Sequence, residues 1–178
     1  MDITQKSAPA NVVLIGMAGA GKSTVGKELA RLLNLQFVDV DTVIERNQDT
    51  TLQELLHGLG VHGFRRLEEE ILLSLDYHNH VIATGGSAIY SNAGMEHLKE
   101  NAILVLLDVS FDLLEQRVGD FSARGLVKSS NQSFKQLFAE RQPLYEKHAD
   151  LTIECTDRSV SDICVSIKNQ VSDTFYHF

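Results

Sequence analysis

A glycine-rich segment near the start of the chain carries the strongest chemical signal. It begins at Gly16 and ends in Gly21, Lys22 and Ser23, which is the G-x-x-x-x-G-K-[ST] pattern of phosphate-binding loops. Glycines let the backbone wrap around phosphate oxygens, the lysine reaches the β- and γ-phosphates, and the serine hydroxyl ligates Mg²⁺. The pattern predicts a nucleotide site formed by Gly19, Ala20, Gly21, Lys22, Ser23 and Thr24.

The class of phosphate-binding protein is narrowed by motifs that the chain lacks. A GTPase would carry an Asn-Lys-x-Asp motif that binds the base and an Asp-x-x-Gly switch, and the sequence contains neither. With 178 residues, the chain has no room for the extra domains of a motor or transporter ATPase. Two classes remain, a small-molecule kinase and a nucleotide-binding domain that has lost catalysis.

Two aspartates, Asp39 and Asp41, fall at the end of a predicted strand over residues 36–40. One carboxylate at this place could hold a Mg²⁺-bound water, and the other could accept the proton of an acceptor hydroxyl. The ordinary alternative is that Asp41 caps a short helix from Thr42 while Asp39 faces solvent. Their spacing alone leaves both interpretations open.

Two arginines, Arg65 and Arg66, lie at the start of a predicted helix over residues 64–75. Either guanidinium could bind a substrate carboxylate through paired hydrogen bonds. Both could equally form surface ion pairs at helical spacing with Glu68, Glu69 and Glu70. The spacing by itself favours these surface pairs.

Later in the chain, Arg117 and Arg124 flank the start of an irregular segment over residues 119–132, which is rich in glycine, serine and polar side chains. Such a segment is either a plain surface loop or a mobile lid. A lid arginine can neutralise charge on a phosphoryl group in transfer, whereas each arginine, Arg141 included, could also be a solvated surface residue.

The elements that must position these residues alternate along the chain. Apolar runs predict strands at residues 11–15, 36–40, 80–83, 102–109 and 151–154. Helical patterns follow at residues 22–33, 42 onward, 52–56, 64–75, 111–118, 133–147 and after 154, with Pro143 interrupting one of them. Such alternation is typical of an α/β fold, so we expect a parallel five-stranded sheet flanked by helices in one domain over residues 1–178.

Composition limits the partners that the chain can have. A net charge of −8 gives no general attraction for polyanions, so we expect no binding to nucleic acid or to anionic membranes. Cys155 and Cys164 have no metal-binding spacing and are expected to be reduced and partly buried. No secretory signal and no run long enough to span a bilayer is visible, so we expect a cytoplasmic monomer.

Taken together, these segments closely resemble the shikimate kinase family over essentially the whole chain. The resemblance rests on the phosphate-binding loop, the Asp39-Val-Asp41 segment, Phe64-Arg65 with Glu68, and Thr84-Gly85-Gly86. It also rests on Arg117 with Arg124, and on Arg141-Gln-Pro-Leu-Tyr145. This ordered set implies a P-loop kinase fold with a mobile lid, ATP and Mg²⁺ as cofactors, and a small carboxylated alcohol, shikimate, as acceptor.

The resemblance also implies a role for each matching position. Asp39 would organise Mg²⁺ with Ser23, and Asp41 would contact the acceptor hydroxyls and act as the base. Arg65, Gly86 and Arg141 would bind the acceptor carboxylate. Lys22 and Arg124 would stabilise the phosphoryl group during transfer, and Arg117 would lie against the adenine.

The chain departs from the family pattern around the acceptor and the lid. Ser87 stands where the family usually has a third glycine, Gly125 replaces the usual proline of the lid, and His62-Gly63 replaces a Gly-Glu pair. These changes leave other acceptors open, such as homoserine or a sugar acid. A nucleotide-binding regulatory domain without catalysis is the alternative from another functional class.

Overall fold

The computed structural model describes residues 11–119, 126–128 and 131–175. Its centre is one parallel sheet in the order β2-β3-β1-β4-β5. The strands are β1 (Asn11–Ile15), β2 (Gln36–Asp39), β3 (His80–Ala83), β4 (Ala102–Asp108) and β5 (Leu151–Glu154). All four pairings between neighbours are parallel, which confirms the predicted sheet.

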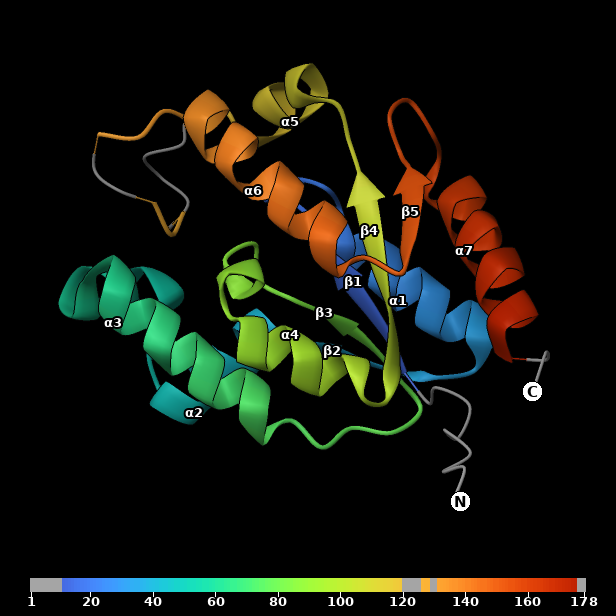
Figure 1. Ribbon diagram of the computed structural model, residues 1–178, viewed down its shortest axis with the longest axis horizontal. Helices are drawn as coiled ribbons and strands as arrows, with labels where there is room; N and C mark the ends of the chain where they lie inside the picture. Colours follow the sequence, from blue (N-terminus) through green and yellow to red (C-terminus); the bar gives the residue numbers. More distant parts are fainter. Residues whose placement is uncertain (1–10, 120–125, 129–130, 176–178) are drawn as a thin grey trace, which may run out of the picture.

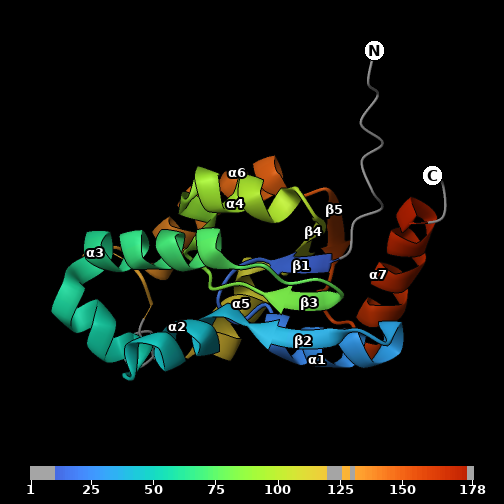
Figure 2. The same ribbon diagram turned by 90° about the horizontal axis from the view of Figure 1, so that it is seen from below.

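Helices cover both faces of this sheet (Figures 1 and 2). The helices are α1 (Lys22–Leu33), α2 (Val40–Gln48), α3 (Leu52–Ser74), α4 (Asn92–Lys99), α5 (Phe111–Val118), α6 (Phe134–His148) and α7 (Val160–Phe175), with a 3₁₀ turn η1 (Ala88–Tyr90). Helices α1 and α7 pack together on one face, while α3, α4 and α6 lie on the other. The central strand β1 is buried at every position, as its unbroken apolar run predicts.

The register of the strands brings the candidate site residues to one edge. Ala83 at the end of β3 pairs with Leu14 of β1 on one side and with Asp39 of β2 on the other. The loops that follow these three strands therefore start side by side. They are the phosphate-binding loop, the start of α2 and the Thr84-Gly85-Gly86 segment.

One predicted boundary at this edge was wrong. Helix α2 begins at Val40, and its cap is Asp39, whose side chain accepts a hydrogen bond from the Asp41 amide, so Asp41 is no cap. The two helices predicted at 52–56 and 64–75 are confirmed as the two parts of α3, although both parts extend further toward Gly60 than predicted. The backbone of Gly60 is not helical (φ +66°, ψ 176°), so the helix direction changes between the two parts.

Two further features were also missed or misjudged. Helix α4 was not predicted, because its sequence is short, weakly patterned and contains Gly94. Its first turn is nevertheless capped by the Ser91 hydroxyl, which accepts a hydrogen bond from the Gly94 amide. Pro143 does not interrupt α6, since the helix continues through it. Buried side chains on both sides of the proline, including Leu137 and Tyr145, hold α6 against the core.

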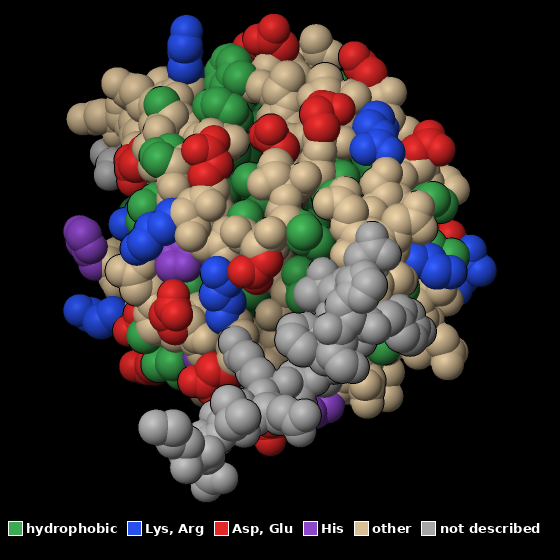
Figure 3. All heavy atoms as spheres, turned by 45° about the vertical axis from the view of Figure 1, so that its right-hand side comes forward, with side chains coloured by type: hydrophobic (Ala, Val, Ile, Leu, Met, Phe, Trp, Pro, Cys, Tyr) green, Lys and Arg blue, Asp and Glu red, His purple; other side chains and the backbone are tan. Residues whose placement is uncertain are grey.

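The cysteines are free, as the sequence predicts, and the surface carries charges of both signs. Acidic and basic side chains are interspersed on the face shown in Figure 3. Cys155 and Cys164 are both free and buried, and burial raises the pKa of each thiol, to about 12 and about 11. None of the helices among the described residues is long and apolar enough to cross a membrane.

Candidate active site

The phosphate-binding loop connects β1 to α1 and ends in Gly21, which has a φ of +93°. That backbone conformation is open to glycine and strained for other residues. Among the described side chains none caps α1, so the amide groups of its first turn are free to bind an anion. The loop therefore has the backbone geometry that the sequence motif predicts.

Lys22 lies at the floor of this loop and is only 9% exposed. Its Nζ donates to the carbonyl oxygens of Gly16 and Met17, at 2.6 and 2.9 Å. Burial lowers the pKa of Lys22 to about 8, partly offset by the negative charge of Asp41. The amine is thus held by weak neutral acceptors, and a nucleotide phosphate would be a stronger partner.

Ser23 and Asp39 meet beside the loop. The Ser23 hydroxyl donates to the Asp39 carboxylate at 2.6 Å, and the second oxygen of that carboxylate caps α2. Hydroxyl and carboxylate oxygens are hard donors of the kind that Mg²⁺ prefers. These two side chains are therefore the residues that could hold the metal expected with a nucleotide.

A cleft of about 430 Å³ lies over the loop and extends toward α3 and α6. Its lining combines the phosphate-binding loop with residues from α2, α3, α5 and α6, from the segment after β3 and from residues 126–127. The lining residues are Ala18, Gly19, Gly21, Lys22, Ser23, Thr24, Asp41, Leu52, Phe64, Thr84, Gly85, Gly86, Ser87, Arg117, Leu126, Val127 and Arg141. The cleft thus joins a phosphate end to an acceptor end.

Two carboxylates converge on Gly85 at the acceptor end. A Cβ atom on Gly85 would lie 2.7 Å from Asp41 Oδ1 and 2.7 Å from Glu68 Oε1, so a larger residue would require these carboxylates to move. Burial raises the pKa of Asp41 to about 6, with a further contribution from the charge of Asp39. Burial likewise raises the pKa of Glu68 to about 7. Acceptor hydroxyls entering here would meet carboxylate oxygens.

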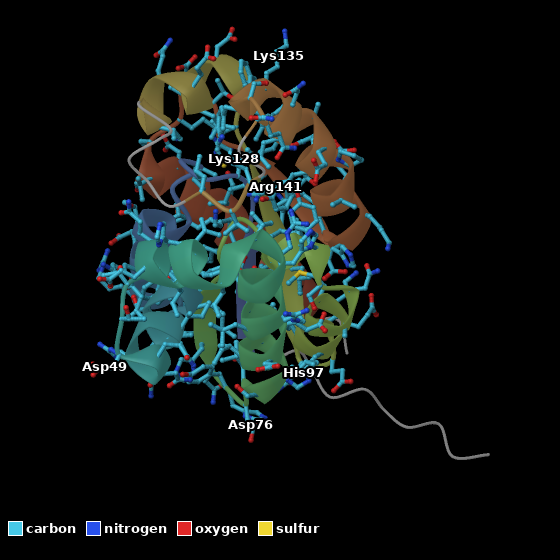
Figure 4. All side chains as sticks on the ribbon, turned by 90° about the vertical axis from the view of Figure 1, so that its left-hand side faces the viewer. Asp49, Asp76, His97, Lys128, Lys135 and Arg141 are labelled. Atoms are coloured by element: carbon cyan, nitrogen blue, oxygen red, sulfur yellow. The ribbon has the colours of Figure 1, made fainter. Side chains whose placement is uncertain are left out.

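Arg141 supplies a buried cation to the same end of the cleft, although it is only 1% exposed. Figure 4 shows it in the interior between α3 and α6. Its Nη2 donates to the Val127 carbonyl at 2.6 Å, and its Nη1 would lie 3.0 Å from a Cβ atom on Gly86. The Tyr145 hydroxyl donates to the Gly86 carbonyl at 2.6 Å and fixes that turn.

Arg65 lies next to this end of the cleft but does not line it. Its guanidinium stacks on the Tyr90 ring, with Cζ 3.5 Å from the ring centroid, and Arg141 lies 5.2 Å from the same centroid. Arg65 lines an adjacent cavity of about 350 Å³, to which Ser87 also belongs. The alternative helical ion pairs of Arg65 and Arg66 with Glu68–Glu70 are not found among the described residues.

The remaining predicted residues fall in three groups. Arg117 lines the cleft, and its Nη1 donates to the Gly19 carbonyl at 3.3 Å. Ala20 is buried, and it is not among the residues that line the cleft. Arg124 and most of the first half of segment 119–132 lie outside the described residues.

Sequence reasoning gave no separate role to two residues that the structure places here. Glu68 was named only as part of the Phe64-Arg65 segment and as a possible surface ion-pair partner one helical turn after Arg65, whereas the structure buries it beside the cleft. Tyr90 was not singled out, because an isolated aromatic residue after a glycine turn carries no motif. Its contact with two arginines depends on packing between α3, η1 and α6.

Comparisons with known proteins agree with this geometry. Residues 18–172 match the family model of shikimate kinase. The shikimate kinase of Vibrio parahaemolyticus is 33% identical over 166 residues, covering 92% of this chain and 96% of that protein. The shikimate kinase of Francisella tularensis subsp. novicida is 35% identical over 157 residues, covering 86% and 89%.

Among solved structures, shikimate kinase from Acinetobacter baumannii in complex with shikimate matches with a TM-score of 0.85 and 34% identity. That match covers 96% of this chain and 97% of that one. A gluconokinase from Sinorhizobium meliloti matches with a TM-score of 0.58 and 15% identity, covering 95% of each chain. The second likeness shows the shared fold alone.

Proposed function

Since the chain belongs to the shikimate kinase family, we propose that it transfers the γ-phosphoryl group of ATP to a hydroxyl of shikimate. The observation that carries this proposal is the arrangement of charges in one cleft. A buried lysine lies at its phosphate end, and buried carboxylates and an arginine lie at its acceptor end. Such a cleft can bind two substrates next to each other.

At the phosphate end, the free amides of α1 and the amine of Lys22 bind the nucleotide phosphates in this proposal. Lys22 exchanges its two carbonyl acceptors for phosphate oxygens and stabilises the charge that develops during transfer. Ser23 and Asp39 hold Mg²⁺, which, when bound, neutralises charge on the phosphates. Arg117 lies at the mouth of the loop, where the nucleoside would lie.

At the acceptor end, Arg141 and Arg65, which both lie next to Tyr90, bind the carboxylate of the acceptor. Gly86 leaves room beside Arg141 for that carboxylate. Asp41 accepts a hydrogen bond from the reacting hydroxyl and takes its proton as the oxygen bonds to the γ-phosphorus and the bond from that phosphorus to the ADP oxygen breaks, releasing ADP. The acceptor hydroxyl is thereby directed toward the phosphate end of the cleft.

The proposal also covers the lid, the oligomeric state and the cellular compartment of the protein. We place the lid at residues 119–132, with Arg124 reaching the phosphates of the nucleotide. The whole chain would act as one kinase domain and as a monomer, since this chain alone builds both ends of the cleft. Two free buried thiols and a dependence on ATP fit the cytoplasm.

The first experiment measures ADP release with ATP and Mg²⁺ in the presence of shikimate, homoserine, gluconate, quinate or no acceptor. Shikimate alone should stimulate turnover strongly. Lys22→Ala should lower that turnover by about 10²–10³-fold, because a donor to the transferring group is lost. Lys27→Ala is a matched control, since Lys27 is on the same helix but packs over Phe37 away from the cleft.

Two results would overturn this assignment. Stimulation by another acceptor, or by none, would show that the acceptor end binds something other than shikimate or does not support transfer. Equal turnover of Lys22→Ala and Lys27→Ala would remove the phosphate-binding loop from catalysis.

A further inference from the structure

Tyr90 contacts both of the arginines that the proposed function assigns to the acceptor carboxylate. It belongs to η1, which packs against α3 and α6, the helices that carry Arg65 and Arg141. Arg65 Cζ lies 3.5 Å from the centroid of the Tyr90 ring, and Arg141 Cζ lies 5.2 Å from the same centroid. Both distances are within the range of about 6 Å over which an aromatic ring attracts a cation. One ring is therefore shared by guanidinium groups from two separate helices.

The hydroxyl of Tyr90 adds a hydrogen bond to one of these arginines. It accepts from Arg141 Nε at 3.3 Å and donates to the Glu140 carboxylate at 2.5 Å. A bond through Nε leaves both Nη groups of Arg141 to other partners. Nη2 donates to the Val127 carbonyl, and Nη1 lies beside Gly86, which lines the cleft. The Tyr90 hydroxyl thus fixes the guanidinium without taking the Nη1 group that an acceptor carboxylate would use.

Two guanidinium groups near one ring need a partner that attracts both of them. Arg65 and Arg141 carry like charges, and Arg141 is only 1% exposed, so water screens little of their repulsion. An aromatic ring attracts cations through its π face and uses none of their N–H donors. Arg65 Nε has no hydrogen-bond partner among the described residues, which agrees with a side chain held by stacking. Tyr90 is therefore suited to holding both arginines ready for the carboxylate of a ligand.

We propose that Tyr90 is a positioning residue for the acceptor: its ring holds Arg65 and its hydroxyl holds Arg141, so that both guanidinium groups face one carboxylate. This inference rests on the proposed function, in which that carboxylate belongs to shikimate. Within the described chain, Tyr90 lines the cavity beside Arg65 but not the cleft itself, so it acts through the arginines and not by touching the acceptor. Tyr90 consequently favours acceptors that carry a carboxylate over acceptors that lack one.

Two substitutions separate the hydroxyl from the ring. Tyr90→Phe removes the bond to Arg141 Nε and keeps the stacking on Arg65. The dissociation constant for shikimate should then rise by about fivefold, because the lost bond goes to a charged group but is long. Tyr90→Leu removes both contacts, and the rise should be about thirtyfold. Calorimetry measures these constants without turnover. The KM for ATP and the kcat at saturating shikimate should stay within about twofold, since no group at the phosphate end changes.

A second acceptor shows whether the effect depends on the carboxylate. An analogue of shikimate with hydrogen in place of the carboxylate gives the arginines nothing to bind. Its kcat/KM should therefore differ by less than about twofold between Tyr90→Leu and the parent, whereas the kcat/KM for shikimate should fall by about thirtyfold. Equal losses for the two acceptors would mean that Tyr90 only supports packing, and would overturn the inference.

A double-mutant cycle tests the link between the Tyr90 hydroxyl and Arg141. In an Arg141→Met background the hydroxyl has no Nε from which to accept. Tyr90→Phe should therefore change shikimate affinity by less than about twofold in that background. A fivefold loss there would show that the hydroxyl does not act through Arg141, and would overturn its proposed role.

Tyr77→Leu is the matched control for Tyr90→Leu. Tyr77 is half-buried like Tyr90, and its ring contacts that of His80, with the two centroids 4.7 Å apart, at the start of β3 and away from the cleft. This substitution should lower the melting temperature and leave shikimate affinity unchanged. A similar loss of shikimate affinity in both leucine variants would report a general loss of packing and would count against the inference.

A crystal structure of Tyr90→Leu gives a readout that needs neither turnover nor binding. Displacement of the Arg65 or the Arg141 guanidinium would support the inference, and two guanidinium groups that keep their positions would overturn it. A parent chain that does not phosphorylate shikimate would instead refute the proposed function. The crystal structure would still decide whether Tyr90 positions the two arginines.

Discussion

Replacing Arg141 by methionine should remove most of the affinity for the acceptor while leaving the nucleotide end intact. Methionine fills a similar volume, so the core around this 1% exposed side chain keeps its packing. The guanidinium that faces Gly86 disappears, together with its bond to the Val127 carbonyl. The Tyr90 hydroxyl also loses the donor Arg141 Nε, at 3.3 Å, but keeps its bond to Glu140, whereas the acceptor carboxylate loses a buried cation.

The size of this loss follows from the number of donors removed. One hydrogen bond to a charged group contributes about 1.5–3 kcal/mol, and a guanidinium binds a carboxylate through two of them. A loss of about 3 kcal/mol corresponds to a rise of about 150-fold in the dissociation constant for the acceptor. Arg65, which stacks on Tyr90, still provides one cation, so binding should weaken but persist.

Steady-state kinetics with varied shikimate and varied ATP would measure both affinities. We expect the KM for shikimate to rise by about two orders of magnitude and the KM for ATP by less than about threefold. Arg66→Met is the control, because Arg66 is the exposed neighbour of Arg65 and is not part of the cleft lining. A rise in the shikimate KM below threefold, or an equal rise in the ATP KM, would refute the role of Arg141.

Two further predictions concern stability. Burial raises the pKa of Glu68 from 4.5 to about 7, so stability is lost as pH rises through this range, by at most about 3 kcal/mol. Glu68→Gln avoids that loss. The melting temperature of the variant minus that of the parent should therefore increase between about pH 5 and pH 7.5, and a constant difference would contradict this prediction. Gly60→Ala should lower the melting temperature by about 3 °C because of its φ of +66°, whereas Gly58→Ala, with free space around it, should not.

The parts of the site that depend on local sequence were predictable. The phosphate-binding loop needs glycines, a lysine and a serine in one short run, and it has the predicted place between β1 and α1. The meeting of the site residues at one edge of the sheet was predictable too, because parallel strands bring their carboxyl ends together. Both conclusions rest on neighbours in sequence or on a general rule of topology.

The direction of each acceptor-end side chain was not predictable in the same way. Spacing along α3 favoured ion pairs between Arg65 and the following glutamates, but packing against η1 stacks Arg65 on Tyr90. The cap of α2 moved from Asp41 to Asp39 because the strand ends one residue early. For Arg65, a contact between distant segments decided among local options of similar energy.

The charged groups in and beside the cleft point to a site arranged for ligands rather than for stability. Burial lowers the pKa of Lys22 and raises the pKa of both Asp41 and Glu68, so the fold disfavours the charged form of all three. A phosphate beside the lysine would favour its charged form and offset part of that cost. Because ligands that bind only the folded chain raise its stability, the fold and the proposed reaction depend on the same few side chains.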